Sequence, residues 1–97
     1  MAESKELAGK LKVLGHPLRL RIVVLLAREE GEMYLNEIAD SLRINRALAK
    51  IHLKLEDAGI VKSRVVLIEG EAKALRYYKL QDFDICISSK LFREGEK

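Results

Sequence analysis

Tryptophan and threonine are absent from this chain of 97 residues, and cysteine and proline occur once each. The single cysteine, Cys86, excludes an internal disulfide and any cysteine cluster that would hold a metal. We expect Cys86 to be a small buried hydrophobe in preference to a redox or intersubunit thiol. No apolar run is long enough to cross a bilayer, and the first residues lack the pattern of an export signal. These absences predict a cytoplasmic protein without a membrane segment.

Catalytic motifs are missing as well. The sequence has no phosphate-binding glycine loop, no evident Ser-His-Asp arrangement and no pair of histidines at metal-ligand spacing. Its two histidines are His16, which we expect to cap a helix or form a turn, and His52. We expect His52 to be partly buried and hydrogen-bonded, in preference to a pH sensor. The sequence therefore predicts no enzymatic activity, no metal and no cofactor.

Apolar residues make up 48% of the chain and charged residues 34%, which is the composition of a globular protein. The length predicts one small domain over residues 1–97 with a thin core, in which residues 92–97 fray. The net charge of +3 is too small to identify a partner by itself. The placement of the cations must therefore carry the functional argument.

The first half of the chain has helical periodicity. Leu7, Leu11 and Leu14 recur at helical spacing, and Gly15 is expected to end this first helix in the left-handed conformation. Proline suits the first turn of a helix, so a second helix is predicted from Pro17 to about residue 28. This helix is apolar nearly all round, which predicts a central position or coverage by a second subunit.

A helix-turn-helix is predicted next. Residues 33–35 are expected to form a very short strand, after which Asn36 caps a third helix over 37–42. Asn45 is expected to cap a fourth helix over 46–58, which Gly59 ends. Two helices joined by so short a turn are typical of a helix-turn-helix.

Strand-like patterns fill the remainder. Residues 61–68 and 75–80 predict a hairpin with a flexible tip at 69–73. Phe83, Ile85 and Ile87 alternate with polar residues and Cys86, which predicts a third strand with one apolar face. A last short turn is expected to be capped by a serine at position 88 or 89.

The fourth predicted helix combines an aliphatic and a cationic face. Leu48, Ile51, Leu55 and Ala58 share the face expected to pack on the core. The cationic face, with small and aliphatic residues between its charges, would suit a DNA major groove, where Arg and Lys reach phosphates or guanine and Ala or Leu contacts thymine methyl groups. An ordinary solvated face remains the alternative. The residues predicted to contact DNA from this segment are Arg43, Asn45, Arg46, Ala49, Lys50, Leu53 and Lys54.

The hairpin would then act as a wing that lies on the sugar-phosphate backbone. Its predicted phosphate contacts are Lys62, Arg64, Lys73 and Arg76. Acidic residues at positions 69 and 71 oppose this role, so a merely solvated tip remains the alternative.

Four segments together resemble the ArsR-like family of winged helix-turn-helix transcription regulators: "LKVLGHPLRLRIVVLL", "EIADSL", "HLKLEDAGIV" and "LRYYKL". The resemblance implies an α+β winged helix-turn-helix fold, with about four helices followed by a two-stranded β wing. The predicted C-terminal strand over 83–87 departs from the family, in which many members have a long C-terminal helix for dimerisation. Family members that sense metals often carry a Cys-x-Cys pair at the start of the third helix, where this chain has Tyr34 and Asn36. The variant is similar to small archaeal winged-helix regulators and is expected to lack that metal site.

Two functions are compatible with this reading. The first is a sequence-specific regulator, expected to be a repressor, that binds double-stranded DNA as a homodimer with its fourth helix in the major groove and its wing on the backbone. The second is a winged-helix module that binds proteins within a transcription or processing complex. Binding to DNA would weaken steeply with salt, which separates the two. A small-molecule effector cannot be identified from the sequence. The expected dimer contacts are Leu7, Leu11, Leu14, Phe83, Ile85 and Ile87.

Overall fold

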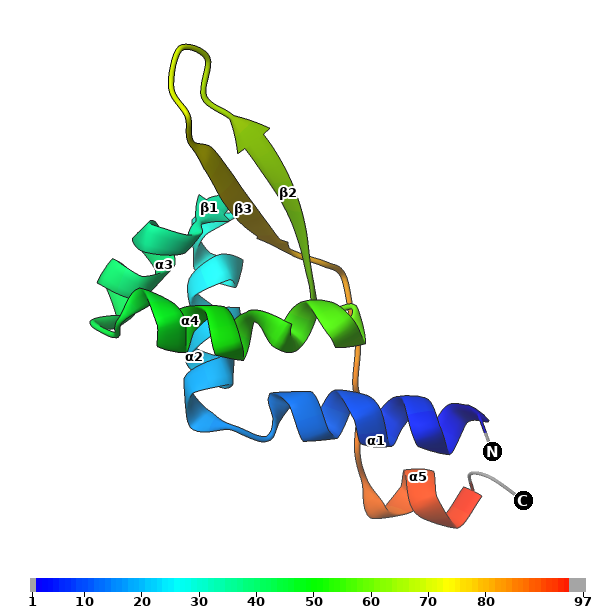
Figure 1. The fold of residues 1–97 in the computed structure, drawn as a ribbon. Coiled ribbons are helices and arrows are strands. Elements are labelled where there is room, and N and C mark those ends of the chain that lie inside the picture. The colour runs from blue at the N-terminus through cyan, green and yellow to red at the C-terminus, as the bar shows by residue number, and fades with distance from the viewer. Residues whose placement is uncertain (1, 95–97) are drawn as a thin grey trace.

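The computed structural model describes residues 2–94 and has a helical body from which a β hairpin projects (Figure 1). The molecule is 57 Å long and 24 Å across, with the hairpin tip and the last helix at opposite ends. The elements in chain order are α1 (Ala2–Leu14), α2 (Pro17–Glu29), β1 (Met33–Tyr34), α3 (Leu35–Leu42), α4 (Arg46–His52), the 3-10 helix η1 (Leu53–Ala58), β2 (Val61–Leu67), β3 (Ala74–Leu80) and α5 (Ser89–Glu94). No helix in this part of the chain combines the length and the apolar character needed to cross a membrane.

Helix α2 begins where proline predicted it, and His16 is its cap. Nδ1 of His16 accepts a hydrogen bond from the backbone N–H of Leu18 at 3.1 Å, which confirms the expected capping role. Ile22 and Leu26 are fully buried, so α2 is central to the core. Leu20 and Val24, however, are about half exposed on the opposite side.

Gly15 ends α1 for a different reason from the predicted one. Its φ is not positive, so the expected left-handed conformation is wrong. A Cβ at this position would lie 3.0 Å from the carbonyl oxygen of Leu11. Glycine is therefore favoured because the chain folds back closely on the last turn of the helix.

The helix-turn-helix is present, with one shifted boundary. Helix α3 begins at Leu35, one residue before the predicted cap Asn36, because β1 runs directly into it. The backbone N–H of Tyr34 donates to Oε1 of Glu37 at 3.0 Å, so a side chain from inside the helix caps it. Asn45 caps α4 as predicted, and its Oδ1 accepts from the N–H of Leu48 at 2.7 Å.

The fourth helix changes its geometry at His52, where the α-helix becomes the 3-10 helix η1. A 3-10 helix has about three residues per turn, so side chains three apart share a face. The buried residues of α4 and η1 are Ala49, His52, Leu53 and Leu55. Ile51, predicted in the core from a spacing of 3.6 residues, is instead 53% exposed. Gly59 ends η1 with a φ of 74°, as predicted.

The sheet is antiparallel in the order β1-β3-β2, and its hairpin confirms the predicted wing. The register runs from Val61 opposite Leu80 to Leu67 opposite Ala74, which leaves the loop 68–73 at the tip. The expected short strand is β1, in which Met33 pairs with Tyr78. The third strand of the sheet therefore comes from the segment before α3.

The predicted C-terminal strand is wrong. Residues 81–88 have no regular secondary structure, because the chain leaves the sheet after Gln81 and runs past α1 to α5 (Figure 1). In this segment Phe83 and Ile85 are half-buried, Ile87 is exposed, and Cys86 is exposed rather than buried as predicted. Helix α5 follows, and Oγ of Ser88 accepts from the N–H of Leu91, which confirms the expected serine cap.

Helix α5 includes residues 92–94, which were expected to fray, and residues 95–97, the rest of that prediction, lie outside the described part. One hydrophobic core joins α2, α3, α4, η1 and the base of the sheet. Its buried members are Ile22, Leu26, Met33, Leu35, Ile38, Ala39, Leu42, Ala49, Leu53, Leu55, Ile60, Val61 and Tyr78. The hairpin contributes Val61 and Tyr78 to this core.

Candidate nucleic-acid interface

Three cations predicted to contact DNA lie on the surface of α4 and η1. Arg46, Lys50 and Lys54 are all exposed. Arg46 and Lys50 are four residues apart in α4, so they lie on one side of the helix about one turn apart. Lys54 follows after another four residues in η1.

Two residues predicted on this face are buried instead. Ala49 is 0% exposed and Leu53 is 3% exposed, so neither side chain is available to contact a base. The prediction placed the core face on Leu48 and Ile51, whereas α4 packs through Ala49 and His52, one residue further along, and Leu53 follows Ala49 on the same side. Ala47, which is exposed, and Ile51 take the outward positions that were predicted for Ala49 and Leu53.

The hairpin has two distinct faces, because side chains alternate along each strand. We name them by their position relative to α4 and η1. The inner face is formed by Val61, Ser63, Val65, Leu67, Ala74, Arg76, Tyr78 and Leu80, and the outer face by Lys62, Arg64, Val66, Leu75, Tyr77 and Lys79. Val61 and Tyr78 are buried against the helices, which identifies the inner side.

A chain of hydrogen bonds connects the inner face to η1. Oγ of Ser63 donates to Oε1 of Glu56 at 2.7 Å and accepts from Nη1 of Arg76 at 3.0 Å. Arg76 is therefore oriented on the same side of the hairpin as Arg46 and Lys50. One of its N–H groups is occupied by the serine, and the guanidinium has four others.

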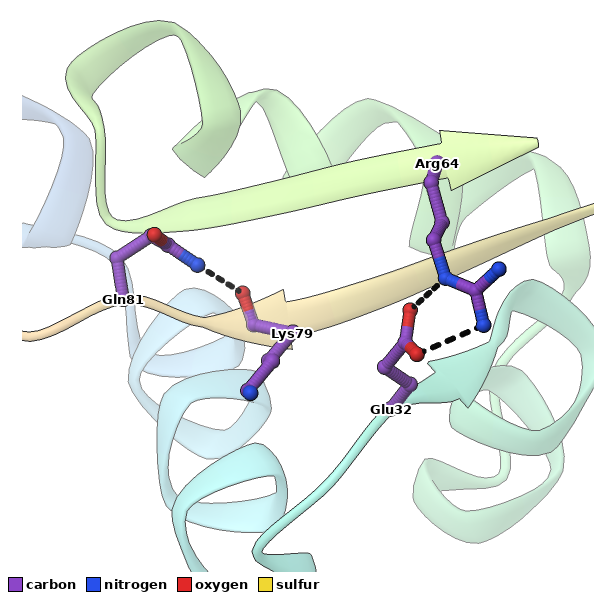
Figure 2. Close-up of polar contacts among 4 residues, drawn as sticks. All are labelled: Glu32, Arg64, Lys79 and Gln81. Atoms are coloured by element: carbon purple, nitrogen blue, oxygen red, sulfur yellow. Dashed lines mark hydrogen bonds and ion pairs between the residues drawn. The ribbon is translucent and has the colours of Figure 1, made fainter.

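On the outer face, the carboxylate of Glu32 neutralises Arg64, one of the predicted DNA contacts (Figure 2). Nε and Nη2 of Arg64 donate to the two carboxylate oxygens of Glu32 at 2.6 and 2.9 Å. These bonds hold the pKa of Glu32 below its ordinary value, and the charge of Lys79 acts in the same direction. The Arg64 guanidinium also lies 5.5 Å from the centre of the Tyr77 ring. Lys62 and Arg64 thus lie on the opposite side of the hairpin from Arg46, Lys50 and Arg76.

The other predicted contacts lie at turns. Lys73 is exposed in the hairpin loop, next to the exposed carboxylates of Glu69 and Glu71. Arg43 is exposed in the turn between α3 and α4 with a φ of 56°. The side chain of Asn45 is engaged in capping α4 through its oxygen.

A hollow lies where α4, the hairpin and the start of α3 meet. It has a volume of about 220 Å³ and is lined by three cationic side chains, from Arg46, Lys50 and Arg76. The remaining lining is neutral and comes from Tyr34, Leu35, Asn36, Val65, Ala74, Leu75 and Tyr78. No carboxylate lines this hollow, whereas the broader hollow beside η1 is lined in part by Glu56 and Asp57. Positive charge is therefore concentrated near the start of α4.

His52 fixes the last turn of α4 from the inside. Its Nδ1 accepts from Nε of Arg19 at 3.1 Å, and Nη1 of Arg19 also donates to the carbonyl oxygen of Val13. The ring of His16 lies 4.4 Å from that of His52, centre to centre. Burial lowers the pKa of His52, and the charges of His16 and Arg19 add to the effect. The expected role of His52, a partly buried and hydrogen-bonded histidine, is confirmed.

The residues predicted at a dimer contact differ in exposure. Leu7, Leu14, Phe83 and Ile85 are half-buried, and Leu14 and Phe83 pack against the core. Leu11 and Ile87 are 39% and 47% exposed. Leu91 and Phe92, which the prediction did not include, are 41% and 64% exposed in α5. Within residues 2–94, no three His, Cys, Asp or Glu side chains are grouped so that they could hold a metal ion.

A helix-turn-helix followed by a β hairpin defines the winged helix-turn-helix class of proteins. Residues 16–63 match the family model described as bacterial regulatory protein, arsR family. This chain belongs to the ArsR family of winged helix-turn-helix transcription regulators. The match includes α2, the helix-turn-helix and the beginning of β2, so it contains most of the candidate interface.

Solved structures agree with this assignment. The homodimeric winged helix-turn-helix DNA-binding domain of a possible ArsR-family regulator from Mycobacterium bovis is 31% identical, with a TM-score of 0.66 over 81% of this chain and 67% of that one. The transcriptional repressor BigR from Xylella fastidiosa is 28% identical, with a TM-score of 0.62 over 84% and 74% of the two chains. A search of curated proteins finds no match.

These findings confirm the ArsR resemblance and the winged-helix fold, and they identify a family of regulators rather than enzymes. Both organisms are bacteria, so the matches do not support the narrower likeness to archaeal regulators. ArsR-family regulators bind DNA, which favours the first of the two functional hypotheses.

Proposed function

We propose that this protein is a sequence-specific regulator, acting as a repressor in the cytoplasm, that binds double-stranded DNA as a homodimer. Helix α4 would enter the major groove, and the hairpin would lie along the adjacent backbone. The observation that carries the proposal is the convergence of Arg46, Lys50 and Arg76 on one side of the molecule, from two different elements.

Each group on this side has a suitable partner on a duplex. Arginine donates two parallel hydrogen bonds to guanine, and lysine binds phosphates or guanine as a point charge. Ala47 and Ile51 offer exposed apolar surface between the cations, which suits the methyl group of thymine. Arg43 and Lys73, at the two ends of this surface, would contact phosphates.

A homodimer would supply a second recognition helix. One such helix spans few base pairs, and two helices about one DNA turn, roughly 34–36 Å, apart read a palindromic site. The relative from Mycobacterium bovis is described as homodimeric, and BigR as a repressor. In this chain the partly exposed side chains of Leu11, Ile87, Leu91 and Phe92 offer apolar area in α1, in α5 and in the segment before α5. We propose that these regions form the subunit contact.

The test uses a duplex selected by the purified protein from random or genomic DNA, with affinity measured by fluorescence anisotropy. Arg46→Gln, Lys50→Gln and Arg76→Gln should each weaken binding by about 1–3 kcal/mol. Loss of discrimination against a mutated site would mark a base contact, whereas a uniform loss would mark a phosphate contact. Unchanged affinity in all three variants would show that this side of the molecule does not face DNA.

A further inference from the structure

We propose that the hollow lined by Arg46, Lys50 and Arg76 binds a small organic anion, with one carboxylate or phosphate group on an apolar body, and that this binding excludes DNA. The lining of the hollow alone supports the anion site. Its effect on DNA rests on the proposed function, because the same three cations are assigned to the duplex.

The charges in the hollow are uncompensated. Arg46 and Lys50 are four residues apart in α4, a spacing at which like charges destabilise a helix. Neither forms an ion pair within the described part of the chain, where the only ion pair joins Arg64 and Glu32. Arg76 approaches from β3 and is held by a hydroxyl group rather than by a carboxylate. An anion between these three groups would relieve their mutual repulsion and accept their remaining N–H groups.

The apolar part of the lining favours an organic anion over an inorganic one. Leu35, Val65 and Ala74 bring apolar surface to the hollow, and Tyr78, which is 3% exposed, also lines it. A bare inorganic ion would leave this apolar surface in contact with water. Sites for small molecules typically combine such apolar walls with a few charged or polar groups.

The size of the hollow limits the ligand. Its volume of about 220 Å³ is below the roughly 300–1,000 Å³ of sites for drug-sized molecules. A single ring or a short aliphatic chain with one acidic group is therefore the class that fits. Such a ligand would bridge α3, α4 and the hairpin, and would occupy the cations that a DNA backbone needs.

The first experiment uses the full chain without DNA, titrated with phenyl phosphate and with inorganic phosphate, and followed by backbone amide NMR. We expect saturable shifts at α4 and β3, with phenyl phosphate bound about tenfold more tightly because its ring buries apolar area. Arg76→Gln should weaken both ligands about tenfold. The matched control Glu32→Gln/Arg64→Gln, on the outer face, should bind both as the original chain does. The amide spectrum shows directly that each variant is folded.

A second variant separates the apolar wall from the charges. Val65→Ser, on the inner face of the hairpin, should weaken phenyl phosphate and leave inorganic phosphate unchanged. Equal affinity for the two ligands would overturn the organic-anion site, as would shifts that do not saturate or an equal loss in the control.

The second experiment adds the selected duplex to the protein loaded with phenyl phosphate. Displacement of the ligand in proportion to the duplex bound is the expected result, and simultaneous binding of both would overturn the exclusion. A chain that binds phenyl phosphate but no duplex of any sequence would disprove the proposed function and leave the anion site intact.

Discussion

Arg19 donates a hydrogen bond from Nε to Nδ1 of His52 at 3.1 Å, and so ties α2 to the last turn of α4 from beneath. The same guanidinium also donates from Nη1 to the carbonyl oxygen of Val13 in α1. The outward presentation of Lys50 and Ile51 therefore depends on a polar contact on the inner side of the same helix. Since the bond requires an unprotonated Nδ1 on His52, the position of α4 is linked to pH.

The free energy of unfolding is expected to fall in mildly acidic solution. Burial lowers the pKa of His52 in the folded chain, whereas the unfolded chain has the ordinary value of 6.5. Below pH 6.5 the unfolded state therefore binds more protons, and stability decreases as pH falls toward the folded-state pKa. The contribution is complete above 6.5.

Urea denaturation across this pH range measures the effect. His52→Phe should abolish the slope, while His16→Gln, which removes the neighbouring ring, should retain it. The window above pH 4.5 excludes Glu32, whose lowered pKa makes its own contribution disappear only in more acidic solution. A slope that persists in His52→Phe would contradict this assignment.

Ala47 and Ala49 form a matched pair, because both lie in α4 but Ala47 is exposed and Ala49 is buried. Ala49→Leu adds volume to a fully buried site and should destabilise the fold by about 1–3 kcal/mol. Ala47→Leu lies on the exposed side and should change stability by no more than about 0.5 kcal/mol. Chemical denaturation of the two variants checks the orientation. A damaging Ala47→Leu together with a harmless Ala49→Leu would contradict this orientation of α4.

Replacing two glycines with alanine is expected to change the stability of the fold in opposite directions. Gly59 has a φ of 74°, so Gly59→Ala should destabilise the fold by about 1–2 kcal/mol through strain at the end of η1. Gly9 lies within α1, where an added Cβ would have no neighbouring atom within 4 Å, so Gly9→Ala should stabilise the chain by roughly 0.5–1 kcal/mol. Thermal unfolding of the two variants measures both. A stabilised Gly59→Ala chain would contradict the left-handed conformation.

Local signals in the sequence predicted most of the fold. Pro17, Asn45 and Gly59 act through the backbone of their own turn, so the helix boundaries that they set follow from neighbouring residues alone. The hairpin follows from strand-forming runs on either side of a turn. The ArsR resemblance rested on these same segments and is confirmed.

The errors arose where distant parts of the chain decide the structure. Ala49 in α4 and Leu53 in η1 pack on the core, whereas the aliphatic spacing of Leu48, Ile51, Leu55 and Ala58 favoured a neighbouring face of the helix. The third strand required a pairing between Met33 and Tyr78, which are far apart in the sequence. Glu32 neutralises Arg64 across a separation of 32 residues, so a count of cations on the hairpin did not reveal which of them face α4.

The most direct test of the account is the salt dependence of duplex affinity in three proteins: the original chain, Arg76→Gln, and Glu32→Gln/Arg64→Gln. The two variants change the two faces of one hairpin. If Arg76 contacts a phosphate, its loss should reduce the slope of log K against log salt by about 0.9, whereas the double variant should leave the slope unchanged. A reduced slope in the double variant together with an unchanged slope in Arg76→Gln would place the duplex on the other face and contradict the proposed interface.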